Sequence, residues 1–505
     1  MKTEGVEVVL NGTCHLVDRG TRISRLLTPS HGVSMICGGK GVCRKCRVRA
    51  WGELSPLTDR EKECFTKEEQ QAGYRLACCT TVEGPCRILT DSPGHSRICA
   101  EGVMPDFRWD PCFTDYGAAI DVGTTTLALH LYDRCSLRAE VAAPNPQSVF
   151  GGDVISRITQ SLEGKGAELS TCIRQALSSL LTEGAVKAGI PVTAIDSMVI
   201  TGNTTMLYLL TGRDVRCLSQ APFEADHLFG ETLTAEELEL PCRASVYLTP
   251  CISAFVGGDI TTALLASGIY QSEHTAMLAD IGTNGEIALF HNGELLCCAT
   301  AAGPAFEGAG LSMGMTGMTG AIDRLTVEGR RLRCHVIDEA APIGICGSGI
   351  VDAIACLLKL EQLDETGRLM EDPVVLDGEV RLTGQDVRMI QLAKGAIRAG
   401  METLLHYARI SAEDLQELAI AGGFGRYIDV GNAAAIGLIP TVSADRVRVL
   451  GNAALVGADM ILLDKRAALQ ASAIAAQTRT VELSGDPVFR DQYVENMGFW
   501  NDENG

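Results

Sequence analysis

The sequence predicts a multidomain α/β protein: a small N-terminal β-grasp domain, then a larger two-lobed domain built from two similar α/β halves. With 505 residues the chain is long enough for two or three domains. Two observations carry the prediction. Three cysteines lie in one glycine-rich stretch, Cys37-Gly-Gly-Lys-Gly-Val-Cys43-Arg-Lys-Cys46. Farther along, an apolar strand that ends in aspartate before a turn of small residues occurs twice, at Asp121 and at Asp280.

The cysteine stretch has the composition of a loop that binds a metal cluster. Its glycines let the backbone fold tightly and turn amide groups towards cluster sulfurs. The spacing C-x5-C-x2-C, with a distant fourth cysteine, is close to the plant-type ferredoxin pattern and lengthens its first gap by one residue. The spacing therefore indicates a [2Fe–2S] cluster. Arg75-Leu-Ala-Cys78 resembles the ferredoxin ending and favours Cys78 over Cys79 as the fourth ligand. The predicted ligands are Cys37, Cys43, Cys46 and Cys78.

A structural zinc site and a chance cluster of thiols are the alternatives. Zinc knuckles usually offer two separated C-x2-C pairs, and this stretch has one. Most of the 20 cysteines are scattered singly through apolar segments, as Cys172, Cys251 and Cys356 are. We expect these to be reduced thiols in the protein core, which predicts a reducing compartment.

Composition excludes two classes of partner. A net charge of -20 argues against nucleic-acid binding, which needs a basic surface. The sequence contains no run of 18 or more apolar residues, and Met1–Glu7 contains no apolar segment. It therefore predicts neither a membrane span nor an export signal, and we expect a cytoplasmic protein.

Residues 1–92 are predicted to form the small domain. Two strands flank the tight turn Asn11-Gly12, and a capping box at Thr58-Asp-Arg-Glu61 starts a short helix. Three prolines without periodicity between them mark 93–116 as a linker. The other expected elements are strands at Val6–Leu10, Thr13–Val17, Cys46–Trp51 and Cys86–Leu89, and a short helix at Arg22–Leu27.

Residues 117–275 and 276–470 are predicted to be the two lobes. Gly117–Leu131 matches Ala276–Phe290, since each is an apolar strand, a small-residue turn and an alternating return strand. Two similar lobes facing each other enclose a cleft for a ligand. Residues 471–505 are expected to dock on this domain. Further pairs recur in the same order: Met198–Asn203 with Leu418–Gly423, and Val256–Asp259 with Val456–Asp459.

The two turns have the composition of phosphate-binding loops. Glycine and threonine let backbone amides and hydroxyls approach phosphate oxygens, and the preceding carboxylates can hold Mg²⁺, mostly through water. One such turn alone could be a plain hairpin. Two at matching places predict an ATP clamp. The residues predicted to bind nucleotide in the turns are Gly123, Thr124, Thr125, Thr126, Gly282, Thr283 and Asn284.

With these motifs, residues 117–470 resemble the ASKHA superfamily of actin, sugar kinases and chaperone ATPases. The resemblance implies that the turns after Asp121 and Asp280 are the first and second phosphate loops, and that both aspartates orient magnesium or the attacking water. It implies that Ala421-Gly422-Gly423-Phe424-Gly425 is the adenosine motif. It also implies that Gly344-Ile-Cys-Gly347-Ser-Gly349 opens the helix connecting the lobes.

Nearly the whole chain resembles the reductive activators of corrinoid-dependent methyltransferases. This resemblance rests on the cysteine module and on Asn145-Pro-Gln, Phe150-Gly-Gly-Asp-Val154, Gly202-Asn-Thr-Thr-Met206 and Ala302-Gly303-Pro-Ala-Phe-Glu307-Gly. It implies an ATP-dependent enzyme that passes one electron from the cluster to an inactive Co(II) corrinoid protein, restoring Co(I). An upstream low-potential electron donor is the second implied partner, and a homodimer is expected. Gly303 and Gly347 complete the predicted nucleotide-binding residues.

Two features depart from that family. The linker at 93–116 leaves no room for the additional domain of longer members, and Gly314-Met-Thr316 stands where an arginine is expected. Other functions are an ATP-driven electron donor to another metalloenzyme, a redox-sensing ASKHA kinase of small molecules, and a non-catalytic nucleotide-binding protein. Lys394 is predicted either to reach the nucleotide or to lie on a solvated helix face.

Overall fold

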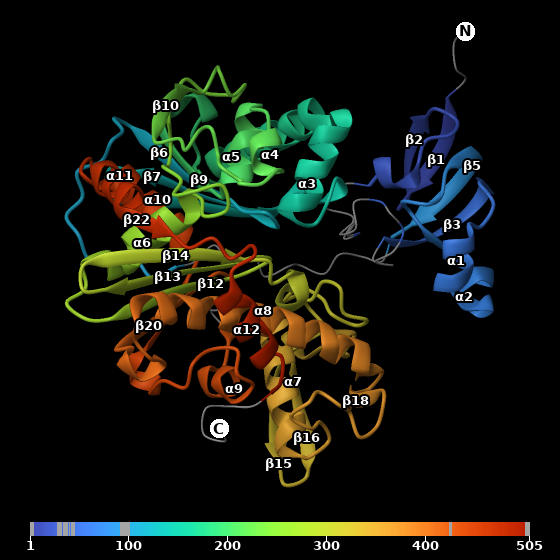
Figure 1. The fold of residues 1–505 in the computed structure, drawn as a ribbon. Helices are drawn as coiled ribbons and strands as arrows, with labels where there is room; N and C mark the ends of the chain where they lie inside the picture. The colour runs from blue at the N-terminus through green and yellow to red at the C-terminus, as the bar shows by residue number, and fades with distance from the viewer. Residues whose placement is uncertain are drawn as a thin grey trace.

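The computed structural model describes residues 5–27, 33, 39, 41, 46–90, 102–423 and 427–499. A five-stranded N-terminal sheet lies beside a two-lobed body that contains two six-stranded sheets (Figure 1). The predicted multidomain α/β architecture is confirmed. Among the described residues, no helix is both long enough and apolar enough to cross a membrane.

The N-terminal domain is a mixed sheet of strand order β2-β1-β5-β3-β4, in which β1 and β5 run parallel. The 3-10 helix η1 (Ile23–Arg25) occupies the predicted short helix. Helix α1 (Asp59–Cys64) begins at the predicted capping box of Thr58, and α2 (Lys67–Gln71) begins at a second box at Thr66. The strands are β1 (Val6–Leu10), β2 (Thr13–Val17), β3 (Arg47–Leu54), β4 (Tyr74–Leu76) and β5 (Val82–Leu89).

A buried glutamate fastens the turn after β4 to helix α1. Glu61 is fully buried, and its Oε1 accepts hydrogen bonds from Arg75 Nε at 2.9 Å, Leu76 N at 3.1 Å and Thr80 Oγ1 at 2.9 Å. Its Oε2 also accepts a bond from the backbone of Thr58, at 2.9 Å. One carboxylate thus fixes both the start of α1 and the segment that contains Cys78 and Cys79.

The first lobe is built on a sheet of strand order β10-β11-β9-β6-β7-β8. Strands β6 to β8 form an antiparallel meander, whereas β9 runs parallel to β6 and β11 runs parallel to β9. Helices cover its outer face and share an apolar core with it. The elements are β6 (Tyr116–Val122), β7 (Thr126–Asp133), β8 (Leu137–Pro144), α3 (Val154–Gln160), α4 (Gly166–Ala188), β9 (Ile195–Gly202), α5 (Thr204–Thr211), β10 (Glu231–Thr234), β11 (Ser245–Leu248) and α6 (Gly258–Ser267).

The second lobe repeats this plan with strand order β21-β20-β12-β13-β14-β22. A small sheet of β15, β16 and β17 and the hairpin β18–β19 are added to it. Its elements are β12 (Ala276–Ile281), β13 (Gly285–His291), β14 (Glu294–Thr300), β15 (Ala321–Glu328), β16 (Arg331–Val336), β17 (Gly344–Ile345), α7 (Gly347–Lys359), β18 (Val374–Asp377), β19 (Val380–Leu382), α8 (Gly384–Ala408), β20 (Glu417–Ala421), α9 (Val430–Ala435), β21 (Val447–Gly451), α10 (Ala453–Leu463), α11 (Ala467–Gln477), β22 (Thr478–Thr480) and α12 (Pro487–Glu495).

Two glycines occupy equivalent places in the two sheets. Gly202 ends β9, and Gly422 follows β20, the corresponding strand. A Cβ atom on Gly202 would lie 2.6 Å from the carbonyl oxygen of Val122, and one on Gly422 would lie 2.7 Å from that of Ile281. Each carbonyl belongs to the residue after Asp121 or Asp280. Only glycine allows the strand end to approach the loop this closely.

Helices α6, α10 and α11 lie between the two sheets, and one apolar cluster joins them to both. Helices α6 and α10 touch directly, since a Cβ on Gly457 would lie 2.0 Å from the carbonyl oxygen of Thr262. The expectation that the helix opened by Gly344–Gly349 connects the lobes is wrong. That helix, α7, contacts β15 and α9 within the second lobe because its buried face belongs to that lobe's outer core.

The matched motifs ending in Asp259 and Asp459 are displaced relative to each other. Asp259 lies in the first turn of α6, whereas Asp459 lies in the middle of α10. There Asp459 is fully buried, and its Oδ2 is 2.8 Å from His130 Nδ1 on β7. The two helices correspond in position, but Asp259 lines the cavity between the lobes whereas Asp459 contacts His130.

The segments before and after the two-lobed domain pack on it through contacts between residues distant in sequence. Gly102 and Asp110, in the described part of the predicted linker, form β-bridges with Gly451 and Asp464 of the second half. After residue 470, β22 pairs with β14 and α12 packs on α8. Helices α6 and α11, from different halves of the chain, also pack together. The packing therefore does not mark a boundary between the lobes, and the predicted domain limits stay predictions.

Both predicted positions of Lys394 are wrong. The side chain is fully buried, and its Nζ lies 5.7 Å from the ring centroid of Phe499. It does not line the cavity between the lobes. The C-terminal segment covers this face of α8, so a residue that helical spacing places at the surface is enclosed.

Replacing Glu61 with alanine should destabilise the N-terminal domain by about 3 kcal/mol, because the buried Arg75 would lose its carboxylate. Hydrogen exchange of peptides from residues 58–80 in the full chain measures this as faster local opening. The matched control is Glu83→Ala, which removes an exposed ion pair with Arg19 and should leave this exchange nearly unchanged. Equal effects of the two substitutions would contradict the role given to Glu61.

Candidate functional site

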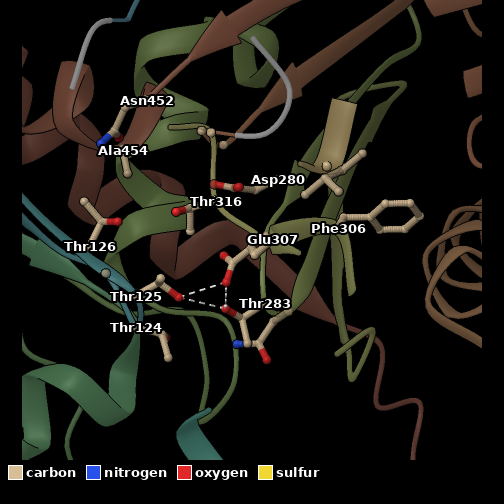
Figure 2. A pocket seen from close by; sticks show the side chains of 18 of the residues that line it. Thr124, Thr125, Thr126, Asp280, Thr283, Phe306, Glu307, Thr316, Asn452 and Ala454 are labelled. Atoms are coloured by element: carbon tan, nitrogen blue, oxygen red, sulfur yellow. Dashed lines mark hydrogen bonds between the residues drawn. The ribbon is translucent and has the colours of Figure 1, made fainter. Parts of the chain in front are cut away.

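A cavity of about 300 Å³ lies between the two lobes, where the turns of β6–β7 and β12–β13 face each other (Figure 2). It is lined by residues from both halves of the chain. The residues predicted from sequence that the structure brings together there are Asp121, Gly123, Thr124, Thr125, Thr126, Asp280, Gly282, Thr283, Asn284, Gly347, Gly422 and Gly423.

Of the two remaining predicted nucleotide-binding residues, one lies away from the cavity and one is not described. Gly303 does not line the cavity. Its φ of +80° turns the chain into the 3-10 helix η8 (Pro304–Glu307), which brings Phe306 and Glu307 to the cavity wall. Phe424 lies outside the described residues.

Glu307 joins the two predicted phosphate loops. Its Oε2 accepts hydrogen bonds from Thr125 Oγ1 at 2.9 Å and Thr283 Oγ1 at 2.8 Å, and the two hydroxyl oxygens are 3.2 Å apart (Figure 2). Burial raises the pKa of Glu307, and the two threonine bonds oppose that rise. One carboxylate oxygen therefore accepts a hydrogen bond from the phosphate loop of each lobe.

Four further carboxyl groups crowd the same wall. Burial raises the pKa of Asp121 to about 6. Burial, followed by the charges of Asp121 and Glu307, raises the pKa of Asp280 to about 7. Burial and the charges of Asp280 and Asp121 raise the pKa of Asp259 to about 8. Burial, with the charges of Asp259 and Asp280, holds the pKa of Glu286 well above its usual value. A cation at this wall would relieve the repulsion.

Sequence reasoning does not assign Glu307, Asp259, Glu286, Asn452 or Asn203 to the site. Glu307 stands in a motif used only for the family resemblance, and Asp259 follows two glycines in a motif that indicates only a repeat. Glu286 occupies a position that an alternating strand would also explain. Asn452 caps α10 and donates from Nδ2 to Asp121 Oδ2 at 3.0 Å, and Asn203 donates to Thr124 Oγ1 at 3.0 Å. Their amides become visible as site groups only once the lobes pack together.

The donor set suits Mg²⁺, which prefers oxygen ligands and keeps several waters. Across the described ranges, no group of three or more acidic, histidine or cysteine side chains is arranged to hold one metal ion directly. Asp121 and Asp280 therefore fit an ion held through water and through phosphate oxygens of a bound nucleotide. The roles of the individual residues stay predictions.

The N-terminal domain brings together two of the predicted cluster ligands. Cys46 and Cys78 are buried, with their Sγ atoms 3.2 Å apart. Cys79 Sγ lies 3.7 Å from that of Cys78. Cys37 and Cys43 lie outside the described residues. Gly41, with a φ of +71°, closely approaches the thiols, since a Cβ there would lie 2.7 Å from Cys79 Sγ. Paired thiols beside a glycine loop fit a [2Fe–2S] cluster.

Known proteins share this whole arrangement. Residues 274–504 match the family described as the C-terminal domain of RACo, the ASKHA domain, and residues 116–272 match the RACo middle region. The corrinoid activation enzyme RamQ of Eubacterium limosum is 37% identical, over 92% of this chain and 94% of its own. The chain belongs to the corrinoid activation enzyme family. The resemblance inferred from its motifs is thus confirmed.

Two other similar proteins extend the comparison. A [Co(II) methylated amine-specific corrinoid protein] reductase of Methanosarcina barkeri is 24% identical, over 76% of this chain and 77% of its own. The solved structure of a reductive activator for a corrinoid, iron-sulfur protein superposes with a TM-score of 0.73 at 26% identity, covering 98% of each chain. The corrinoid activator fold therefore extends over both the cysteine domain and the two lobes.

The crowded carboxyls of the cavity should make the stability of the protein depend on pH. Because the folded state raises the pKa values of Asp121, Asp280 and Asp259, their contribution is present below about pH 3.9 and is lost as pH rises through 6 to 8. Without cations, the melting temperature should fall between about pH 5.5 and 8.5, and Asp259→Asn should reduce that fall. Added Mg²⁺ should stabilise more at the higher pH. An unchanged fall in the variant would contradict this account.

Proposed function

We propose that this protein is an ATP-dependent reductive activator, which transfers one electron to a Co(II) corrinoid protein and thereby restores the Co(I) state for methyl transfer. One observation carries the proposal. A cysteine site and a two-loop clamp lined by carboxylates occur together in a chain that belongs to the corrinoid activation enzymes over almost its full length. The first supplies the electron and the second uses the nucleotide.

The N-terminal domain would hold the [2Fe–2S] cluster through Cys37, Cys43, Cys46 and Cys78. When bound, this group gives up one electron per turnover, which the Co(II) centre of the partner accepts. Cys78 is favoured as the fourth ligand because its Sγ faces Cys46 and both thiols are buried. Glu61 and Arg75 keep the Cys78 turn in place, so the ligand is positioned before the cluster binds.

The cleft would hold ATP with its phosphates between the two loops. The backbone and hydroxyls of Gly123–Thr126 and of Gly282–Asn284 face this space. Asp121 and Asp280 lie where they can orient Mg²⁺ through water or position the water that attacks the terminal phosphate. Glu307 holds Thr125 and Thr283 at a fixed separation. Hydrolysis to ADP and phosphate removes the group that spans the lobes.

ATP is needed because the electron moves uphill. Co(I) lies at very low potential, so the transfer is favourable only if the protein binds the two corrinoid states differently or if hydrolysis changes the complex. Binding the partner more tightly after reduction than before it would raise the effective potential of the cobalt centre. Opening of the lobes would then release the product. An upstream low-potential donor, a cytoplasmic location and a homodimer are the remaining parts of the proposal.

Anaerobically purified protein should contain about two irons per chain and, after chemical reduction, should show a rhombic one-electron EPR signal. Cys78→Ser should alter or abolish this signal, because it removes the fourth thiolate. Cys79→Ser is the matched control and should retain it. The opposite result would assign Cys79 as the ligand. Zinc in place of iron would remove the electron-transfer step.

Conversion of Co(II) to Co(I) on the corrinoid protein, followed by visible absorbance, should require ATP. Asp280→Asn should slow it by at least about 100-fold, because a group that orients the metal or water is lost. Asp445→Asn is the control, because Asp445 is an exposed carboxylate that does not line the cavity. Reduction that runs equally fast and far without nucleotide would refute the proposed function.

A further inference from the structure

One segment of the first lobe touches both the cysteine domain and the nucleotide cleft. It runs from Asn145 through the 3-10 helix η3 (Pro146–Val149) to Arg157 on α3. Val149 packs against the apolar cluster of the N-terminal domain that includes Cys46 and Cys78. The blue N-terminal domain accordingly lies beside the α3 end of the first lobe in Figure 1.

The start of this segment is bonded to the first phosphate loop. Asn145 is fully buried. Its backbone N donates to the carbonyl oxygen of Thr125 at 2.8 Å, and its Nδ2 donates to that of Gly123 at 2.8 Å. Its Oδ1 accepts from Gln147 N at 3.0 Å and so begins η3. The loop and the helix that bears Val149 therefore share one side chain.

The end of the segment is bonded to the same loop. Arg157 is fully buried, and its Nη2 donates to the carbonyl oxygen of Thr124 at 2.6 Å. Its other nitrogens bond Gly151 O at 3.0 Å and Gln147 Oε1 at 3.3 Å, which closes the segment on itself. The acceptors that the structure gives Arg157 are all neutral, and enclosing a charge in this way costs several kcal/mol. Such a cost favours a functional role over simple packing.

We propose that residues 145–157 couple the nucleotide cleft to the cysteine domain. Three consecutive carbonyls, those of Gly123, Thr124 and Thr125, accept hydrogen bonds from this segment, so a shift of the loop on binding phosphate moves the segment. Val149 transmits the shift to the apolar core of the N-terminal domain, which includes Cys46 and Cys78. Asn145 and Arg157 are positioning residues in this scheme, which rests on the proposed function because it requires a nucleotide in the cleft.

The coupling must be reciprocal. If nucleotide binding changes how strongly the cysteine domain docks on Val149, then loss of that docking changes nucleotide affinity by the same factor. Coupling of this kind typically amounts to roughly 5- to 150-fold. The coupling can therefore be measured as a change in nucleotide affinity at the cleft or as a change in hydrogen exchange in the N-terminal domain.

The test compares Val149→Asp with Val186→Asp in the full chain, by calorimetric titration with ADP and with a non-hydrolysable ATP analogue. Val149→Asp places a charge in the docking contact and should change the Kd by about fivefold or more. Val186 is exposed on α4, outside the segment, so its substitution is the matched control and should leave the Kd unchanged. Val149→Ile, which keeps the apolar contact, should retain the wild-type value.

A second readout separates the coupling from the binding itself. In the wild type, ADP should change the hydrogen exchange of β3 and β4, and Asn145→Ala and Arg157→Lys should reduce that response. Equal Kd values for wild type and Val149→Asp, with exchange in β3 and β4 indifferent to ADP, would overturn the coupling while leaving the ATPase in place. A wild type that binds neither nucleotide would instead refute the proposed function and the coupling together.

Discussion

The repulsion among buried carboxylates is the constraint on which the larger domain depends. Asp121, Asp259, Asp280, Glu286 and Glu307 line one cavity, and burial there leaves their charges poorly screened from one another. The protein offsets part of this repulsion itself, through the threonine hydroxyls on Glu307 and the Asn452 amide on Asp121. The remainder calls for a cation. An anionic nucleotide alone would fit poorly beside these groups, whereas its magnesium complex would be complementary to them.

The sequence predicted the features that depend on local pattern. Both strand–turn–strand units, the capping box at Thr58 and the cavity-lining turns after Asp121 and Asp280 follow from periodicity and small residues, which act over a few positions. Features that arise from tertiary packing were not predicted from the sequence. Asp259 and Asn452 reach the cavity only because helices α6 and α10 begin there, and Lys394 is enclosed by a segment about a hundred positions away. The position of the helix that begins at Gly347 also depends on packing, so its sequence alone did not predict it.

The cysteine domain is organised around a buried ion pair, whereas the lobes are organised around a cavity lined by carboxyl groups. Its apolar core is small, and a single buried ion pair between Glu61 and Arg75 sets the geometry of the turn that contains Cys78. A preformed turn lowers the ordering cost of binding a cluster. In the proposed function, the same turn would keep the Cys78 thiol in one place during electron transfer. The cysteine site and the nucleotide cleft are thus held by separate domains of one chain.

The helices that begin at the cavity show how two copies of one plan diverged. Helix α6 of the first half presents the carboxylate of Asp259 towards Asp280, whereas its counterpart α10 presents the amide of Asn452 to Asp121. One end of the cavity therefore presents a carboxylate from the first turn of its helix, and the other presents an amide from the cap of its helix. The two ends are chemically unequal, although the two halves share one fold. An asymmetric ligand is bound differently by such ends in its two orientations.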